Sequence, residues 1–344
     1  GIANPDLSWF ESKIANIGFE LSILNGLFTA EFDMFRRDRS GLMARRNLTL
    51  PTSFGTELPE ENLNSDMTRG FELVLGHNNT IGDFTYGVKS NATITRSRNK
   101  YVERAPDSNK YTNWRNNSND RNKDLTWGYT MIGQFRDYEE ILNSPVQDSN
   151  GNKSLLPGDF KYKDLNGDNI IDDNDQCPIG NPIYPQLTAG ITAGFEYKGF
   201  DFSMLWAGSG KVSRFISAGL RVPFGGGNYG LLQYMIDDHW TPETAETAKT
   251  PRFSGAANAN NYTRNSTLWL KDASYIRLKN VQIGYTFKGE WMKKIHLKNM
   301  RIYASGENLL TFDHLKIADP EATDDKQFQY PLQMIFNIGL NLNF

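Results

Sequence analysis

The sequence contains very little cysteine and no long apolar run. Cys177 is the only cysteine among 344 residues, which excludes an intramolecular disulfide and a metal site built from several thiolates. No window approaches the roughly 18 apolar residues that a membrane-spanning helix needs, and the mean hydropathy is −0.56. A helical membrane protein is therefore excluded. A transmembrane barrel is not, because alternating strands hide a lipid-facing side from any average.

Charge of one sign is also scarce. The 37 Lys and Arg residues nearly balance the 40 Asp and Glu residues and leave a net charge of −3, so we expect no nucleic-acid partner. Residues 1–9 lack the basic start and the apolar core of a signal peptide. A fragment or a processed N-terminus would explain this, and the strand count given below favours a fragment.

Apolar and polar side chains alternate along residues 333–344, except at Ile335. Apolar residues occupy every even position from Met334 to Phe344, while amides and glycine fill the odd positions from Asn337 to Asn343. Because a strand sends successive side chains to opposite faces, one face is continuous hydrocarbon and the other is polar. This pattern, ending on an aromatic residue, is typical of a barrel strand between lipid and a wet lumen. A half-buried strand of a soluble sheet shows the same alternation.

The same pattern recurs along the chain and predicts further strands. They cover residues 15–23, 28–34, 70–76, 84–94, 187–197, 200–206, 275–287 and 299–307. The strand at 275–287 changes phase near Asn280, which predicts a bulge. The clearest strand has these residues on one face: Leu187, Ala189, Ile191, Ala193, Phe195 and Tyr197. The opposite, polar face of the strands would form a hydrated interior packed on a plug or lining a substrate route, and it includes Glu20, Glu31, Asp33, Glu72, Lys89, Asn91 and Glu196.

The connections between these strands alternate between short and long. Residues 98–186 and 211–273 are very long, and a loop of about 30 residues is expected after Arg36. Outer-membrane barrels have short periplasmic turns and long extracellular loops. We therefore predict an all-β, transmembrane antiparallel β-barrel, with the C-terminus in the periplasm and the long loops outside the cell. Residues 1–344 would supply only about nine or ten strands, so other strands must close the barrel.

Short motifs along the whole chain point to a known family. They include Asn4-Pro5-Asp6-Leu7-Ser8-Trp9, Gly70-Phe71-Glu72-Leu73, Ile179-Gly180-Asn181-Pro182, Lys271-Asp272-Ala273-Ser274-Tyr275, Gly306-Glu307-Asn308-Leu309 and Tyr330-Pro331-Leu332. In this order they resemble landmarks of the SusC/RagA family of TonB-dependent outer-membrane transporters. The resemblance implies a barrel of about 22 strands, of which this chain would be the C-terminal part. It also implies an N-terminal plug and a TonB-contacting segment, both absent here.

The resemblance further implies a function in nutrient uptake. A transporter of this kind would import oligosaccharides or oligopeptides with a SusD-like lipoprotein as a lid over its mouth. Its implied partners are the remainder of the barrel and plug, this lipoprotein, the TonB complex, the glycan or peptide substrate, and the lipid bilayer. No enzymatic activity is implied.

One loop matches a calcium-binding motif. Oxygen donors stand at positions 1, 3, 5, 7, 9 and 12 of a twelve-residue loop, where position 7 contributes its backbone carbonyl: Asp164, Asn166, Asp168, Ile170, Asp172 and Asp175. Position 6 is Asn169 instead of glycine, although asparagine tolerates the positive φ needed there. The aspartate at position 12 reaches less far than the usual glutamate. We expect a structural calcium site, with a solvated acidic turn as the alternative.

Two other functions stay open at this point. One is a soluble calcium-dependent carbohydrate-binding β module with long recognition loops, and the other is a surface hydrolase on a β scaffold. The hydrolase needs a catalytic pair, which the sequence does not reveal, so no catalytic residues are predicted. Some loop aromatics would stack on sugars, anchor a lid or form small loop cores: Tyr111, Trp114, Trp127, Tyr229 and Trp240. The substrate class does not follow from the sequence.

Overall fold

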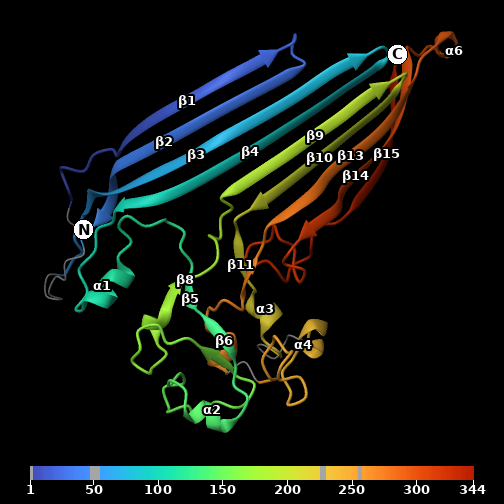
Figure 1. Cartoon of the computed structure of the whole chain (residues 1–344). Coiled ribbons are helices and arrows are strands. Elements are labelled where there is room, and N and C mark those ends of the chain that lie inside the picture. The colour runs from blue at the N-terminus through green and yellow to red at the C-terminus, as the bar shows by residue number, and fades with distance from the viewer. Residues whose placement is uncertain (1–2, 47–54, 225–229, 255–257) are drawn as a thin grey trace.

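The computed structural model describes all residues except 1–2, 47–54, 225–229 and 255–257, and its main element is one nine-stranded antiparallel sheet (Figure 1). The strands follow one another in chain order, and β1 and β15 form the two edges. This agrees with the predicted strands. Their bounds are β1 (Glu11–Ile23), β2 (Phe28–Arg45), β3 (Glu60–Ile81), β4 (Phe84–Tyr101), β9 (Leu187–Tyr197), β10 (Phe200–Gly210), β13 (Tyr275–Phe287), β14 (Asn299–Asp313) and β15 (Ile335–Asn343).

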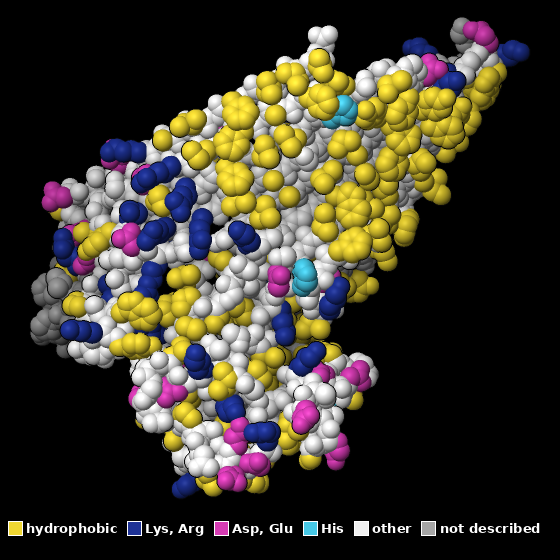
Figure 2. Space-filling model, viewed as in Figure 1, with side chains coloured by type: hydrophobic (Ala, Val, Ile, Leu, Met, Phe, Trp, Pro, Cys, Tyr) yellow, Lys and Arg dark blue, Asp and Glu magenta, His cyan; other side chains and the backbone are white. Residues whose placement is uncertain are grey.

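The register of the sheet places the apolar positions of all nine strands on one face, here called the outer face. Phe19 lies opposite Phe32, and their rings stack with centroids 5.6 Å apart. Farther along the sheet, Tyr86 lies opposite Phe195. The outer face forms a broad apolar band in Figure 2, and Ile338 at one edge is 87% exposed. The band is therefore not covered by protein in the described part of the chain.

A bulge in β13 keeps the apolar side chains before and after it on the outer face. Against β10 the register shifts between Leu278 and Asn280, so Lys279 is the extra residue of that pair. Against β14 the register shifts at the same place, where Asn308 and Leu309 lie opposite Lys279. A bulge inserts one residue and so reverses the side-chain phase. Ile276 and Leu278 thereby rejoin the face that carries Ile283. The bulge predicted near Asn280 is confirmed.

The strands β2 and β3 are longer than the sequence predicted. They stay paired well beyond Arg36, and only residues 46–59 connect them. The expectation of a loop of about 30 residues after Arg36 is therefore wrong. Polar side chains predominate on both faces of this extension, and its few apolar residues do not alternate with them. Side chains stabilise it instead, as where Arg39 Nε donates to Asp66 Oδ1 at 2.8 Å.

The connections alternate between the two ends of the sheet, as predicted (Figure 1). One end, the short-turn end, carries residues 24–27, 82–83, 198–199 and 288–298, and the C-terminus lies there too. The last of these connections contains helix α6 (Glu290–Lys293). The other end, the long-loop end, carries residues 46–59, 102–186, 211–274 and 314–334.

The three longest connections, residues 102–186, 211–274 and 314–334, fold together into what we call the loop assembly. No helix within the described ranges is long and apolar enough to cross a membrane. The helices of the assembly are α1 (Lys110–Asn116), α2 (Tyr138–Leu142), α3 (Ala218–Arg221), α4 (Gln233–Asp237) and α5 (Ala259–Tyr262), with a 3-10 turn η2 (Asp173–Asp175). Its strand pairs are β5 (Trp127–Tyr129) with β8 (Gln176–Pro178), β6 (Met131–Gln134) with β7 (Phe160–Tyr162), and β11 (Ser213–Phe215) with β12 (Leu270–Asp272).

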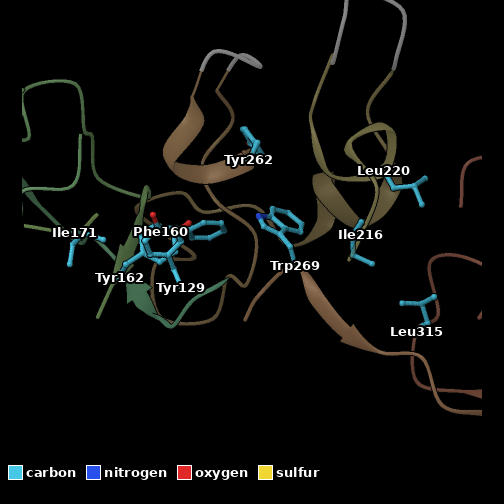
Figure 3. Close-up of a cluster of buried hydrophobic side chains, with 9 residues drawn as sticks. All are labelled: Tyr129, Phe160, Tyr162, Ile171, Ile216, Leu220, Tyr262, Trp269 and Leu315. Carbon is cyan, nitrogen blue, oxygen red and sulfur yellow. The ribbon is translucent and has the colours of Figure 1, made fainter. Parts of the chain in front are cut away.

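The loop assembly has its own hydrophobic core (Figure 3). The core draws on all three connections, so none of them folds separately. Its buried side chains are Tyr129, Phe160, Tyr162, Ile171, Ile216, Leu220, Tyr262, Trp269 and Leu315. A smaller cluster lies nearby and consists of Phe135, Ile141 and Leu155.

Candidate functional site

A buried amide links two of the long connections inside the loop assembly. Asn261 is fully buried, and its Nδ2 donates to Asp159 Oδ1 at 2.8 Å. Its Oδ1 accepts from the backbone N of Phe160 at 3.0 Å. The indole N of Trp269 donates to the Asn261 carbonyl at 2.7 Å. Buried polar groups with all these partners satisfied specify one arrangement of the chain. The loops therefore present a defined surface at the long-loop end.

A stacked arginine supports the same core. The guanidinium of Arg264 lies 4.8 Å from the ring centre of Tyr129 and 5.4 Å from that of Tyr162. Arg264 Nη2 also donates to the carbonyl of Gln147 at 2.6 Å. Burial raises the pKa of Tyr162 far above its usual value. Its hydroxyl therefore stays neutral and donates to the Asn260 carbonyl at 2.6 Å.

The connection from β14 to β15 is attached to β13 by buried charges. Arg277 is almost completely buried, and its Nη2 lies 3.0 Å from both carboxylate oxygens of Asp319. Arg277 also pairs with Glu321, which accepts from Lys279 Nζ at 2.6 Å. The sequence shows only a family landmark, Lys271–Tyr275, directly before these basic residues. Nothing local signals these ion pairs, because the acidic partners follow some forty positions later.

The predicted calcium loop closes through its two terminal aspartates. Asp164 accepts from the backbone N of Gly167 at 2.7 Å and of Asn169 at 2.9 Å. Asp175 accepts from the backbone N of Leu165 at 2.7 Å. Asn169 has φ 63°, the positive value that position 6 requires. The backbone conformation at position 6 thus agrees with the expectation from the sequence.

The electrostatics of the two closing aspartates differ. Burial raises the pKa of Asp175, against the hydrogen bond that Leu165 donates. Burial also acts to raise the pKa of Asp164, but the amides of Gly167 and Asn169 outweigh it and leave this pKa below its usual value. Two neighbouring carboxylates in a partly buried loop would favour a cation between them.

The remaining predicted ligands lie around the same turn. Asp168 Oδ1 accepts from the backbone N of Ile170 at 2.9 Å, and Asn166 Nδ2 donates to Asp168 Oδ2 at 2.9 Å. Asp172 caps η2 through the backbone N of Asn174 at 2.7 Å. In the part of the chain that the structure describes, no three His, Cys, Asp or Glu side chains are grouped so as to hold a metal ion. Calcium binding therefore stays a prediction.

The loop aromatics have different surroundings. Trp240 is only 9% exposed and belongs to the loop interior. Arg121 lies 4.9 Å from the ring centre of Trp114 and 5.6 Å from that of Trp127. Tyr111 is half-buried, whereas Trp114 is 56% exposed. Tyr229, the fifth candidate, lies outside the described residues.

The inner face of the sheet, opposite the apolar band, carries an acidic group of side chains. Glu20 lies opposite Glu31, and Asp33 lies opposite Glu72. Like charges directly opposite one another destabilise a sheet. Within the described ranges none of these four carboxylates has an ion-pair partner. The predicted polar residues thus share one face, and this face is charged where β1 to β3 meet.

Comparisons with known sequences give partial matches to larger receptors. No family model matches the sequence. TonB-dependent receptor P3 of Formosa agariphila is 28% identical over 365 residues, and TonB-dependent receptor SusC of Bacteroides thetaiotaomicron is 24% identical over 351 residues. Each alignment covers 99% of this chain, but 35% and 32% of the respective receptor. The chain thus spans about a third of the length of the curated relatives it matches.

Solved structures show the same fold. The RagAB peptide importer in its open-open state matches 99% of this chain and 35% of its own chain, with a TM-score of 0.74 and 20% identity. The closed-closed state gives a TM-score of 0.73. The relatives are receptors and not enzymes, in agreement with the sequence, and they do not favour a soluble carbohydrate-binding module. With the register of the sheet, these matches show that the chain is similar over nearly its whole length to about a third of SusC-like TonB-dependent receptors, and that its fold matches the C-terminal part of such a barrel.

Proposed function

We propose that this chain is part of a TonB-driven importer for oligosaccharides or oligopeptides. The observation that carries the proposal is the mainly apolar outer face that all nine strands share, combined with a folded loop assembly at one end. A barrel places such a face against lipid and its polar face toward a lumen. The edges β1 and β15 would pair with the remaining strands of the receptor, because open strand edges are not tolerated in hydrocarbon.

The proposed orientation places the short-turn end and the C-terminus in the periplasm and the loop assembly outside the cell. The alternation of connection lengths supports this, since long loops of such barrels are extracellular. The native Cys177 is replaced by serine for the test. One variant of the full-length receptor then carries Lys153→Cys in a long loop, and the other carries Asp83→Cys in a short turn; both positions are exposed.

A membrane-impermeant maleimide should label the Lys153→Cys variant on intact cells. The Asp83→Cys variant should react only after the outer membrane is permeabilised. The reverse pattern would contradict the orientation. Equal labelling of both variants on intact cells would mean that the sheet does not separate two compartments.

A SusD-like lipoprotein would rest on the loop assembly. Exposed aromatic and aliphatic side chains at the long-loop end offer it a contact surface: Trp114, Tyr138, Leu142, Tyr184 and Tyr330. Aromatic residues on a rigid support are strong interface anchors. Tyr184→Ala with Tyr330→Ala should reduce co-purification of the lipoprotein with the receptor. The control Tyr197→Ala changes an exposed tyrosine on the outer face of β9 and should leave co-purification unchanged.

The cargo class is a matter for uptake measurements. One structural relative is named a peptide importer, and peptides and glycans are both compatible with a polar lumen. Cells producing the receptor should accumulate either fluorescent oligopeptides or fluorescent oligosaccharides. Accumulation should stop when the TonB system is inactivated. Accumulation that continues without TonB would rule out the proposed mechanism, and accumulation of neither probe class would rule out the proposed cargo.

We propose calcium as a structural ion in residues 164–175. The order of oxygen donors and the positive φ of Asn169 support it. The site would be weak, with a dissociation constant of about 10⁻⁴–10⁻³ M. Calcium should slow proteolysis of the loop in the full-length receptor, and Asp164→Ala with Asp168→Ala should remove this effect. The control pair, Glu139→Ala with Glu246→Ala, should keep it, and protection that survives in the first variant would rule the site out.

A further inference from the structure

We propose that the outer face carries a binding site for the phosphate group of an anionic lipid. The site is a row of three arginines, Arg36, Arg69 and Arg96, where the apolar band ends toward the long-loop end. The inference rests on the proposed function, because it requires the band to lie in a membrane. It adds a specific ligand chemistry to one place on that surface.

The register brings the three arginines into one line across β2, β3 and β4. Arg36 lies opposite Arg69, and Arg69 lies opposite Arg96. All three side chains are exposed. Figure 2 shows Lys and Arg side chains gathered beside the apolar band over this part of the sheet.

The arginine row directly adjoins the apolar band. Two residues farther along each strand toward the short-turn end, Met34, Phe71 and Ile94 form the neighbouring cross-strand row. Residues two apart in a strand share a face, so both rows point outward. The apolar row and the arginine row are therefore direct neighbours on the outer face of β2, β3 and β4.

Two of the three charges are not neutralised by this chain. Arg36 Nε lies 2.7 Å from Asp38 Oδ2. Among the described residues, Arg69 and Arg96 form no hydrogen bond and no ion pair, although they face each other directly. Like charges in that position destabilise a sheet unless an anion lies between them. Arg98, the next outward arginine on β4, is already engaged, since its Nε donates to the Asp120 carbonyl at 2.6 Å.

A groove of about 460 Å³ joins the arginine row to the apolar band. Its apolar part is formed by Ile17, Met34, Phe71 and Ile94, and its cationic end by the arginine row. A second hollow, also of about 460 Å³, shares Arg69 and Arg96 and extends toward Trp114. The pair of unneutralised arginines thus borders an apolar groove on one side and a hollow of mixed polar and aromatic lining on the other.

A phosphorylated lipid fits this arrangement better than a free anion does. Guanidinium groups bind phosphate through paired, charge-assisted hydrogen bonds. An acyl chain attached to that phosphate would lie in the groove over the apolar row. Inorganic phosphate would use only the cationic end, and an uncharged lipid only the apolar part. A single arginine at a membrane border extends its head into water, but a directly opposed pair without a counter-ion gains from a shared anion.

The test uses the full-length receptor in an uncharged detergent, with phosphatidic acid and phosphatidylcholine as probes in native mass spectrometry. The wild-type receptor should retain phosphatidic acid with a preference of about tenfold or more, as charge-assisted contacts to phosphate would give. Arg69→Gln with Arg96→Gln should remove most of this preference. The control pair, Lys198→Gln with Lys288→Gln, makes the same charge change at the short-turn end and should preserve it.

Further arms separate the possible outcomes. Phe71→Ala should weaken retention of phosphatidic acid, and an equal concentration of inorganic phosphate should not displace the lipid from the wild-type receptor. Displacement by inorganic phosphate, or an unchanged preference in the double arginine variant, would overturn the proposal. If the double arginine variant lost the surface lipoprotein and kept the lipid, the arginine row would be a protein interface, and the proposal would be overturned.

The proposed function is tested separately in the same preparation. Heat-resistant insertion into the outer membrane and uptake should be normal in the double arginine variant. A wild-type receptor that does not insert would refute the membrane assignment itself. Normal insertion without lipid preference would refute only the lipid site.

Discussion

The sheet and the loop assembly sort their apolar side chains in opposite ways. On the sheet the apolar residues point outward, and Ile338 is 87% exposed. In the loop assembly they point inward, and Trp269 is only 3% exposed. Hydrocarbon is expelled from water but not from lipid. The outer face of the sheet is therefore suited to lipid and the loop assembly to water, and the boundary between the two lies near the arginine row.

The largest expected effect comes from removing one edge of the sheet. Deletion of residues 336–344 from the full-length receptor should abolish the folded barrel, because β14 would then present unpaired backbone groups to hydrocarbon. The measurement is heat-modifiable migration of outer-membrane protein on gels. The control Asn337→Ser with Asn341→Ser alters only the polar face of β15 and should migrate normally. A folded barrel from the truncated chain would contradict the outward assignment of this strand.

A substitution in the core of the loop assembly should destabilise the assembly and leave the sheet folded. Trp269→Ala should cost about 3–5 kcal/mol, the usual range for a buried tryptophan. We expect proteases to cut the long connections of this variant, while the barrel still migrates as a folded species. Trp114→Ala changes an exposed tryptophan and serves as the control. If Trp269→Ala lost both the protease resistance of the long connections and the migration of a folded barrel, the loop assembly and the sheet would fold as one unit.

A matched pair on β9 tests the two faces of the sheet directly. Ile191→Arg on the outer face should cost about 2–4 kcal/mol, the range for a cation near the middle of a bilayer. Thr192→Arg, its neighbour on the inner face, should cost clearly less. Unfolding of the receptor in lipid vesicles by denaturant measures both values. Equal losses of unfolding free energy in the two variants would contradict the assignment of the outer face to lipid and the inner face to a lumen.

The smallest expected effect is a pH dependence within the loop assembly. Glu140 is partly buried and pairs with Lys161, and despite the opposing effect of burial its pKa lies below the ordinary 4.5. A lowered pKa in the folded state adds stability above the unfolded pKa, which is lost as pH falls through the folded pKa. Protease resistance of residues 102–186 should therefore fall slightly on acidification, by less than about 1 kcal/mol. Glu140→Gln should reduce this dependence, whereas the exposed Glu139→Gln should not.

The sequence predicts the sheet well because each of its signals is local. The alternation at residues 187–197 depends only on neighbours in the chain. The phase change at Asn280 is local as well, and so is the positive φ of Asn169. The order of the nine strands across the sheet is also simple, because it is the same as their order along the chain.

The loop assembly could not be predicted in the same way. Trp269 and Leu315 meet in one core from different connections, without any period in the sequence. The ion pairs of Arg277 depend on acidic residues in another connection. The extension of β2 beyond Arg36 has mostly polar side chains on both faces, so no alternation marks it in the sequence. Long-range contacts decide these features, and a single sequence does not display them.

In the proposed orientation, the extension of β2 and β3 would form a stiff wall on one side of the mouth of the transporter. Its strands continue about nine residues past Arg36, and at roughly 3.3 Å per residue and a tilt near 45° the wall rises on the order of 20 Å beyond the hydrocarbon. Lys123 of the loop assembly pairs with Asp66 in this wall, so the assembly is braced there. A lid seated on the assembly would meet a fixed support on the side of β2 and β3. Any opening movement would then have its fulcrum at that wall, and the opposite side of the mouth would open widest.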